Sequence, residues 1–164
     1  MLTKNEEAYT KSLKTNLVIA GALAIAIGGF SQAAFSQAAD PVIGQWKTID
    51  DKTGQARSIV KVEEVGGVLQ GTIMQTFPNP NEKPLTHCNA CTDHRKDQPI
   101  VGMKIMTGLK KDKAGHWSGG EILDPKEGKI YKVKVATEDG KKLEVRGFIG
   151  ISLIGRTQTW VREQ

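Results

Sequence analysis

Apolar and polar residues alternate along most of the chain beyond residue 40. In residues 131–135 (Tyr-Lys-Val-Lys-Val), apolar side chains take every second position and lysines take the positions between them. A period of two is typical of a strand with one buried face. Residues 58–62 and 69–73 show a similar alternation on either side of Gly66-Gly67, which predicts a hairpin. The pattern therefore indicates strands along this part of the chain.

Turn signals separate further strands. The Asp-Gly pair at 139–140 predicts a turn between a strand ending near residue 136 and one starting near 143, and residues 124–128 predict another turn, between strands at 117–123 and from 130 onward. A long last strand is expected over 151–162. No segment beyond residue 38 keeps a period of 3.6 over three turns. Seven or eight short strands predict an all-β barrel or sandwich.

One segment interrupts this rhythm. The residues between Phe77 and Pro99 contain three prolines, both cysteines and two of the three histidines, without a strand pattern. An irregular segment of this length in a compact domain usually carries a function or is held by a covalent bond. We therefore expect one long loop that contains the Cys and Pro residues.

The N-terminal residues have the order of a secretory signal peptide. Lys4, Lys11 and Lys14 precede an apolar run over 17–30, and Ser36-Gln37-Ala38 offers small side chains to a signal peptidase. The run is shorter than the 18 or more residues expected of a membrane-spanning helix. We predict a signal peptide over 1–38, a single domain over 39–164, a periplasmic or secreted protein, and no membrane span after cleavage. An uncleaved anchor helix is the alternative.

Composition excludes two classes of protein. Charged residues make up 25% of the chain and hydrophobic residues 38%, which does not fit a multi-span membrane protein or a disordered chain. The net charge is +5, but the lysines are scattered and no run of them alternates with aromatic residues. We therefore expect no nucleic-acid partner.

Two groups of residues carry a resemblance. Gly44-x-Trp46 in the first predicted strand, with arginines in the last one, resembles the barrel closure of lipocalin-like (calycin) proteins, in which an Arg lies over the indole. The chain beyond the signal peptide resembles a family of small exported bacterial proteins known as domain of unknown function 2147. The matching residues are Cys88-x-x-Cys91, Pro99–Gly102, Trp117-x-Gly119-Gly120-x-Ile122-x-Asp124-Pro125-x-x-Gly128-Lys129-x-Tyr131, Leu143-x-Val145-Arg146-Gly147 and Gly155-Arg156-Thr157-x-x-Trp160-x-Arg162. The resemblance implies export and a small antiparallel up-and-down β-barrel, lipocalin-like, and it brings no catalytic residues.

The stretch from His87 to His94 offers the most reactive side chains. A covalent haem site is excluded because Thr92, not His, follows the second cysteine. A redox centre would need a helix at the first cysteine, and a zinc site would need two thiolates and two imidazoles within eight residues. In an oxidising compartment we favour a disulfide between Cys88 and Cys91, which would restrain the loop. We therefore expect no metal and no cofactor.

Catalytic motifs are lacking in the sequence. The chain contains no Gly-x-Ser-x-Gly, no phosphate-binding loop and no His-Glu-x-x-His. His116 beside a strand start and Asp124 before a proline are both explained by turns. We therefore expect a protein that is not an enzyme.

Aromatic and arginine side chains offer a candidate binding site. Four aromatic residues from well-separated predicted strands, Trp46, Trp117, Tyr131 and Trp160, are assigned to inward faces. An Arg near them either stacks in a filled barrel or binds a ligand in a cavity. A cavity would suit a small amphipathic or apolar ligand in the cell envelope. Without a cavity, the protein would be a module that binds another envelope protein. The candidate ligand-binding residues are Trp46, Trp117, Tyr131, Arg146, Arg156 and Trp160.

Overall fold

The computed structural model describes residues 39–79 and 82–164, which form eight β-strands. The strands are β1 (Gly44–Ile49), β2 (Ala56–Val65), β3 (Val68–Thr76), β4 (Lys104–Lys113), β5 (His116–Asp124), β6 (Lys129–Ala136), β7 (Lys142–Phe148) and β8 (Gly155–Arg162). Within the described residues there is no helix of the length and apolarity needed to cross a membrane. The predicted signal peptide over 1–38 lies outside the described residues.

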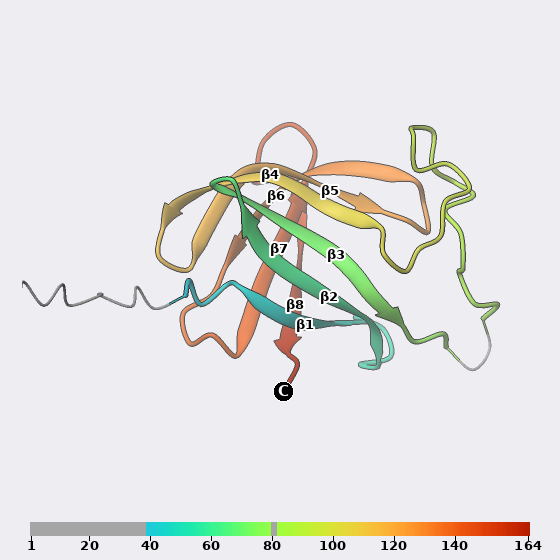
Figure 1. The fold of residues 1–164 in the computed structure, drawn as a ribbon, viewed down its shortest axis with the longest axis horizontal. Helices are drawn as coiled ribbons and strands as arrows, with labels where there is room; N and C mark the ends of the chain where they lie inside the picture. The colour runs from blue at the N-terminus through green and yellow to red at the C-terminus, as the bar shows by residue number, and fades with distance from the viewer. Residues whose placement is uncertain (1–38, 80–81) are drawn as a thin grey trace, which may run out of the picture. The chain divides into compact units, whose positions relative to one another are not determined.

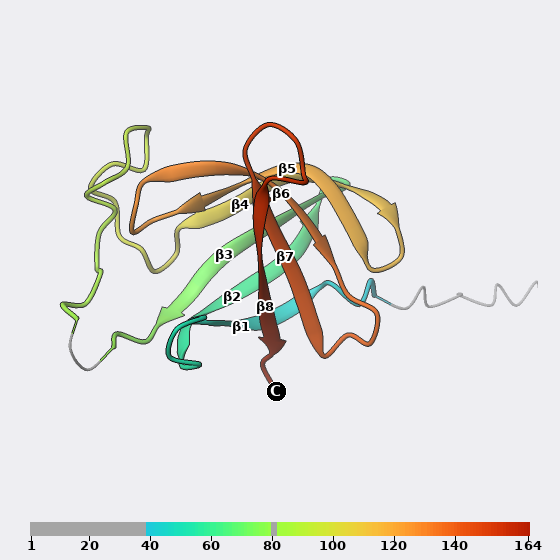
Figure 2. The ribbon, with the colours of Figure 1, turned by 180° about the vertical axis from the view of Figure 1, so that it is seen from behind.

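The eight strands close into one barrel (Figure 1, and from behind in Figure 2). Each strand pairs antiparallel with the next one in sequence, and β8 returns to pair with β1. Trp46 lies opposite Arg162 in this closing pair, and Lys47 opposite Val161. The prediction of a small antiparallel up-and-down β-barrel with one long Cys- and Pro-containing loop is confirmed.

The alternation in the sequence sets which side chains face inward. In β6, Val133 and Val135 are buried, whereas Lys132 and Lys134 are exposed. The β2–β3 hairpin turns at two residues with positive φ, 61° and 80°, which glycine adopts without strain. The two glycines at 66–67 therefore set the register in which Val65 pairs with Val68.

The last strand is shorter than predicted. It begins at Gly155, and residues 149–154 form a loop between β7 and β8. Ile149, at the start of this loop, is exposed. Gly150 has a φ of 71°, a left-handed conformation that takes the chain out of the sheet at this point. The prediction of a strand from residue 151 is therefore wrong.

The two ends of the barrel differ. The β2–β3, β4–β5 and β6–β7 turns lie at one end, which we call the closed end, and the other four loops lie at the open end. At the closed end the guanidinium of Arg162 lies over Trp46, with 4.2 Å between its Cζ atom and the ring centroid. A Cβ atom at Gly44 would displace this guanidinium, and the φ of 146° at Gly44 favours glycine as well. Arg162 also donates hydrogen bonds to the main-chain carbonyls of Pro41, Ile43 and Gly140.

The segment before β1 covers the closed end. The Asp40 side chain is only 2% exposed and lies 3.0 Å from Nζ of Lys111. Its carboxylate accepts hydrogen bonds from the main-chain N–H groups of Val42 (3.0 Å) and Gly115 (3.3 Å). Burial acts to raise the pKa of Asp40, but these hydrogen bonds outweigh burial and lower that pKa below its ordinary value. Asp40 thus joins the start of the barrel to the β4–β5 turn.

Candidate ligand-binding cavity

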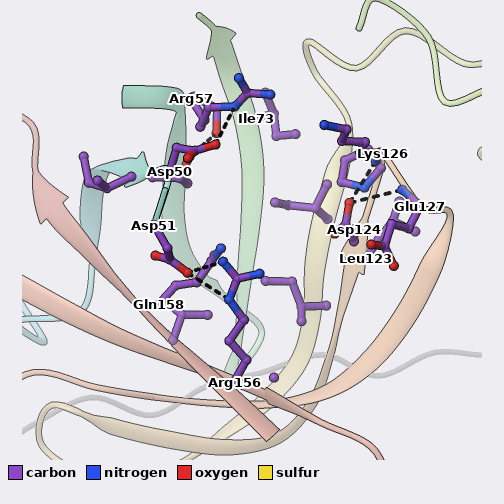
Figure 3. A pocket seen from close by; sticks show the side chains of 18 of the residues that line it. Asp50, Asp51, Arg57, Ile73, Leu123, Asp124, Lys126, Glu127, Arg156 and Gln158 are labelled. Atoms are coloured by element: carbon purple, nitrogen blue, oxygen red, sulfur yellow. Dashed lines mark hydrogen bonds and ion pairs between the residues drawn. The ribbon is translucent and has the colours of Figure 1, made fainter. Parts of the chain in front are cut away.

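A cavity of about 820 Å³ occupies the open end, and all eight strands contribute to its wall. Figure 3 shows part of its lining. Pockets that hold small organic molecules measure about 300–1,000 Å³. The buried part of the wall is apolar throughout. It consists of Ile73, Ile100, Ile105, Leu123, Val145 and Trp160.

Glycines on the strands explain where space remains. A Cβ atom at Gly120 would overlap the Thr107 carbonyl and Leu109, so that glycine permits close packing. A Cβ atom at Gly147 would meet its nearest neighbour, Tyr131, at 3.6 Å, an ordinary contact distance. Gly147 lines the cavity, and its missing side chain leaves volume there. The barrel is therefore filled at the closed end and hollow at the open end.

The mouth of the cavity carries charge in balanced amounts. Its acidic and basic residues are equal in number, so the mouth has no net charge. The acidic ones are Asp50, Asp51, Glu82, Asp124 and Glu127, and the basic ones are Lys52, Arg57, Lys83, Lys126 and Arg156. An apolar interior beneath a charged mouth suits a molecule with an apolar body and a polar end.

Arg57 lies between two carboxylates at this mouth, that of Asp50, which Figure 3 shows beside it, and that of Glu82. Its Nη2 atom donates to Glu82 at 2.9 Å, and its Nε atom lies 3.9 Å from Asp50. The hydrogen bond from Arg57 lowers the pKa of Glu82 below its ordinary value. The Nη1 atom is buried and has no hydrogen-bond partner among the described residues. Because buried donors are normally paired, this donor is an exception at the mouth of the cavity.

Arg156 forms the second charged pair at the mouth. Its guanidinium donates to Asp51 in the β1–β2 loop, from Nε at 2.8 Å and from Nη2. The hydrogen bond with Asp51 raises the pKa of Arg156 above its ordinary value. Both side chains are largely exposed, and exposed ion pairs contribute little to stability. A ligand carboxylate could therefore exchange places with Asp51 at small cost.

The six predicted binding residues divide into two groups of three. Tyr131, Arg156 and Trp160 line the cavity. The other three, Trp46, Trp117 and Arg146, do not belong to its wall.

Each of these three has another place in the fold. Trp46 is buried beneath Arg162 at the closed end. Trp117 is buried too, and the Nζ atom of Lys111 lies 5.8 Å from its ring centroid. Arg146 donates to carbonyls of the β7–β8 loop. Its orientation follows from strand alternation, because its neighbour Val145 faces inward.

Several cavity residues escaped the sequence analysis. Ile73 could have been identified, because it shares the inward parity of Leu69 and Gly71 in β3. Arg57 and Glu82 gave no signal, because their pairing joins β2 to the long loop over a sequence separation of 25 residues. Contacts between a strand and an irregular loop leave no period in the sequence.

The β3–β4 loop forms one side of the mouth, and a disulfide between Cys88 and Cys91 restrains it. Both cysteines are buried. A Cβ atom at Gly128 would overlap the Ala90 carbonyl, so the disulfide loop rests directly on the β5–β6 turn. The predicted disulfide is therefore present, and it takes both thiolates that a zinc site would need. No group of three or more His, Cys, Asp or Glu side chains in 39–79 and 82–164 is placed to hold a metal ion.

Comparisons with known proteins agree with this architecture. Among curated proteins, none matches the chain. A solved structure, protein HP1028 from the human pathogen Helicobacter pylori, which belongs to the lipocalin family, is similar with a TM-score of 0.64 and 19% sequence identity. The match covers 75% of this chain and 83% of that one, and it shows a lipocalin-like fold. The family described as an uncharacterized protein conserved in bacteria, DUF2147, matches residues 44–162, and the chain therefore belongs to the DUF2147 family.

Proposed function

We propose that this protein binds a small amphipathic molecule in the cell envelope, with the apolar body of the molecule in the barrel and its polar end at the mouth. The observation that carries the proposal is the 820 Å³ cavity, whose buried wall is apolar and whose mouth holds paired charges. Lipocalin-like folds host many kinds of binding, so the fold alone does not choose the ligand. The site favours a ligand such as a long-chain fatty acid.

Two arginines are suited to the polar end. Arg57 has a donor without a partner in the described part of the chain, and Arg156 is held there by a single exposed carboxylate. A guanidinium pairs with a carboxylate through two parallel hydrogen bonds, which a lysine would not reproduce. The apolar chain would then extend toward Trp160, whose indole would report binding through its fluorescence.

The test is a titration with palmitate and with cis-parinaric acid, followed by tryptophan and probe fluorescence. Gly147→Leu should weaken binding at least about tenfold, because its side chain would occupy the cavity without striking the backbone. Thr159→Leu is the matched control, since it adds the same side chain on the outer face of β8. Arg57→Met should weaken palmitate more than the corresponding alcohol, because only the acid can form a charge-assisted pair.

Two results would overturn the proposal. One is the absence of saturable binding for either probe, and the other is equal binding by Gly147→Leu and Thr159→Leu. Either result would favour the alternative function, an envelope module that recognises another protein without using the cavity.

Export is part of the proposal. Cleavage after Ala38 would release a chain that starts at Ala39, directly before the Asp40 contacts at the closed end. N-terminal sequencing of protein recovered from the producing cells should therefore begin at Ala39. A chain that retains residues 17–30 would instead indicate a membrane-anchored protein.

A further inference from the structure

The loop between β7 and β8, residues 149–154, is apolar, uncharged and exposed. We call it the aliphatic loop, and it forms the arch that projects beyond the strands between β7 and β8 in both ribbon views (Figures 1 and 2). Ile149 is 68% exposed, Ile151 60%, Leu153 84% and Ile154 71%. Scattered exposed aliphatic residues are ordinary, but four within six residues form a contiguous patch of the kind that marks an interaction surface.

Three consecutive carbonyl groups of the aliphatic loop, those of residues 151–153, are already paired within the protein. The Arg146 guanidinium donates from Nε to the Ser152 carbonyl at 2.8 Å and from Nη2 to the Leu153 carbonyl at 3.2 Å. The Ile151 carbonyl accepts the main-chain N–H of Ile154 at 3.1 Å. A lipid environment offers few hydrogen-bond donors, so unpaired carbonyls would make it costly for the loop to enter lipid. The loop can therefore meet acyl chains with three consecutive carbonyls satisfied.

The aliphatic loop adjoins the open end of the barrel. Ile149 and Ile154 belong to the cavity wall as well as to the exposed patch. The apolar surface is thus continuous from the tip of the loop into the cavity. A surface that presses on this loop would also face the mouth.

Cationic residues lie beside the loop on the neighbouring strand. In β6, Lys132 lies opposite Phe148 and Lys134 lies opposite Arg146, and both lysines point outward. Lys132 is ion-paired with Glu121 at 2.7 Å, whereas Lys134 has no ion-pair partner among the described residues. Among the same residues, Arg146 donates only to uncharged groups, so Lys134 and Arg146 keep their charge, which anionic lipid headgroups would complement. A second copy of the chain docked symmetrically on the same loop would instead bring like charges together, which is unfavourable.

We propose that the aliphatic loop docks the protein on the surface of a phospholipid bilayer that contains anionic lipids, with the cavity mouth turned toward the lipid. Aliphatic side chains enter the interface while cations contact the headgroups, as in other peripheral membrane contacts. This docking does not depend on whether the cavity holds a ligand.

An environment-sensitive fluorophore attached to a new cysteine tests the contact directly. Because Cys88 and Cys91 are joined to each other, Leu153→Cys and Ala114→Cys each offer one free thiol for labelling with a nitrobenzoxadiazole dye. Ala114 is exposed in the β4–β5 turn at the closed end, so it is the matched control. Vesicles of phosphatidylglycerol and phosphatidylethanolamine should shift the emission of the Leu153→Cys probe to shorter wavelength and leave that of Ala114→Cys unchanged. Both labelled variants contain residues 1–38, so any effect of these residues on vesicle binding is the same in the two experiments.

Vesicle co-sedimentation provides the second measurement. Leu153→Asp should lower the partition coefficient by about tenfold or more, because it removes apolar contact and adds a charge that anionic lipid repels. Val65→Asp makes a similar change at an exposed aliphatic residue of the β2–β3 hairpin and should have little effect. Gly147→Leu should leave partitioning unchanged, which separates this contact from ligand binding.

Three results would overturn the docking proposal. The first is an unchanged emission of the Leu153→Cys probe with both anionic and phosphatidylcholine vesicles. The second is an equal response of the Ala114→Cys probe. The third is a dimer in sedimentation velocity that Leu153→Asp dissociates, since the loop would then contact a second copy of the chain.

Discussion

Replacing Arg162 by alanine should destabilise the barrel at the pair of strands that closes it. The guanidinium stacks on Trp46, an interaction that contributes about 1–2 kcal/mol when partly desolvated. It also donates to three main-chain carbonyls, each hydrogen bond contributing about 1 kcal/mol before water replaces part of it. Because the guanidinium is only partly buried, we expect a total loss of about 3 kcal/mol.

Thermal denaturation followed by circular dichroism measures this loss. A loss of about 3 kcal/mol should lower the melting temperature by roughly 10 °C in a domain of this size. Arg162→Lys should lose about half as much free energy, because an ammonium keeps the charge but lacks the planar group that stacks and donates in three directions. Lys47→Ala is the control on the same strand pair, since Lys47 only forms a partly exposed ion pair with Glu163. If Arg162→Ala melts no lower than Lys47→Ala, the stacked arginine does not hold the barrel closed.

Two further predictions concern the ends of the barrel. Because the pKa of Asp40 is lowered in the folded state, its stabilising effect should be complete above its ordinary value of 3.8 and should disappear as the pH falls through the lowered value. Melting curves of wild type and Asp40→Asn should therefore differ at pH 7 and converge in acid; a constant difference down to the lowest pH would contradict this assignment. Alkylation without reductant should leave Cys88 and Cys91 unmodified, and replacing both by alanine should change the melting temperature by only a few degrees while accelerating proteolysis of the β3–β4 loop, because the disulfide closes a short ring. Free thiols in the native protein, or cooperative unfolding of the whole barrel on their replacement, would oppose that role.

The strands and turns could be predicted because local patterns determine them. The alternation in β6 and the paired glycines at 66–67 each depend on neighbouring residues, so a single sequence carries the signal. The start of β8 was harder to predict, because residues 149–154 are apolar enough for a strand. The Arg146 hydrogen bonds, the hydrogen bond from Ile154 to Ile151 and the φ of Gly150 distinguish this loop from a strand.

The cavity could not be predicted, because it depends on what lies opposite each side chain. Gly120 and Gly147 are both strand glycines, yet a Cβ atom at the first would overlap its neighbours and one at the second would make only ordinary contacts. Similarly, Arg156 and Arg162 share one face of β8, yet the first lies at the open end and the second at the closed end. Distance along a strand, which separates these two environments, is not visible as a period in the sequence.

The pairing of β1 with β8 also determines when the barrel can form. Arg162, at the end of the last strand, contacts the carbonyls of Pro41 and Ile43, which precede the first strand. The sequence separation is 121 residues for Pro41 and 119 for Ile43. Contacts between such distant residues require the whole intervening chain, and they slow folding because a large loop must close first. A chain that emerges N-terminus first, as every chain does from the ribosome, would hold β1 without its second partner until the last strand arrives. During that interval the edge of β1 is open to pairing with other chains, so a chaperone that shields an unpaired strand would be most useful just before β8 appears.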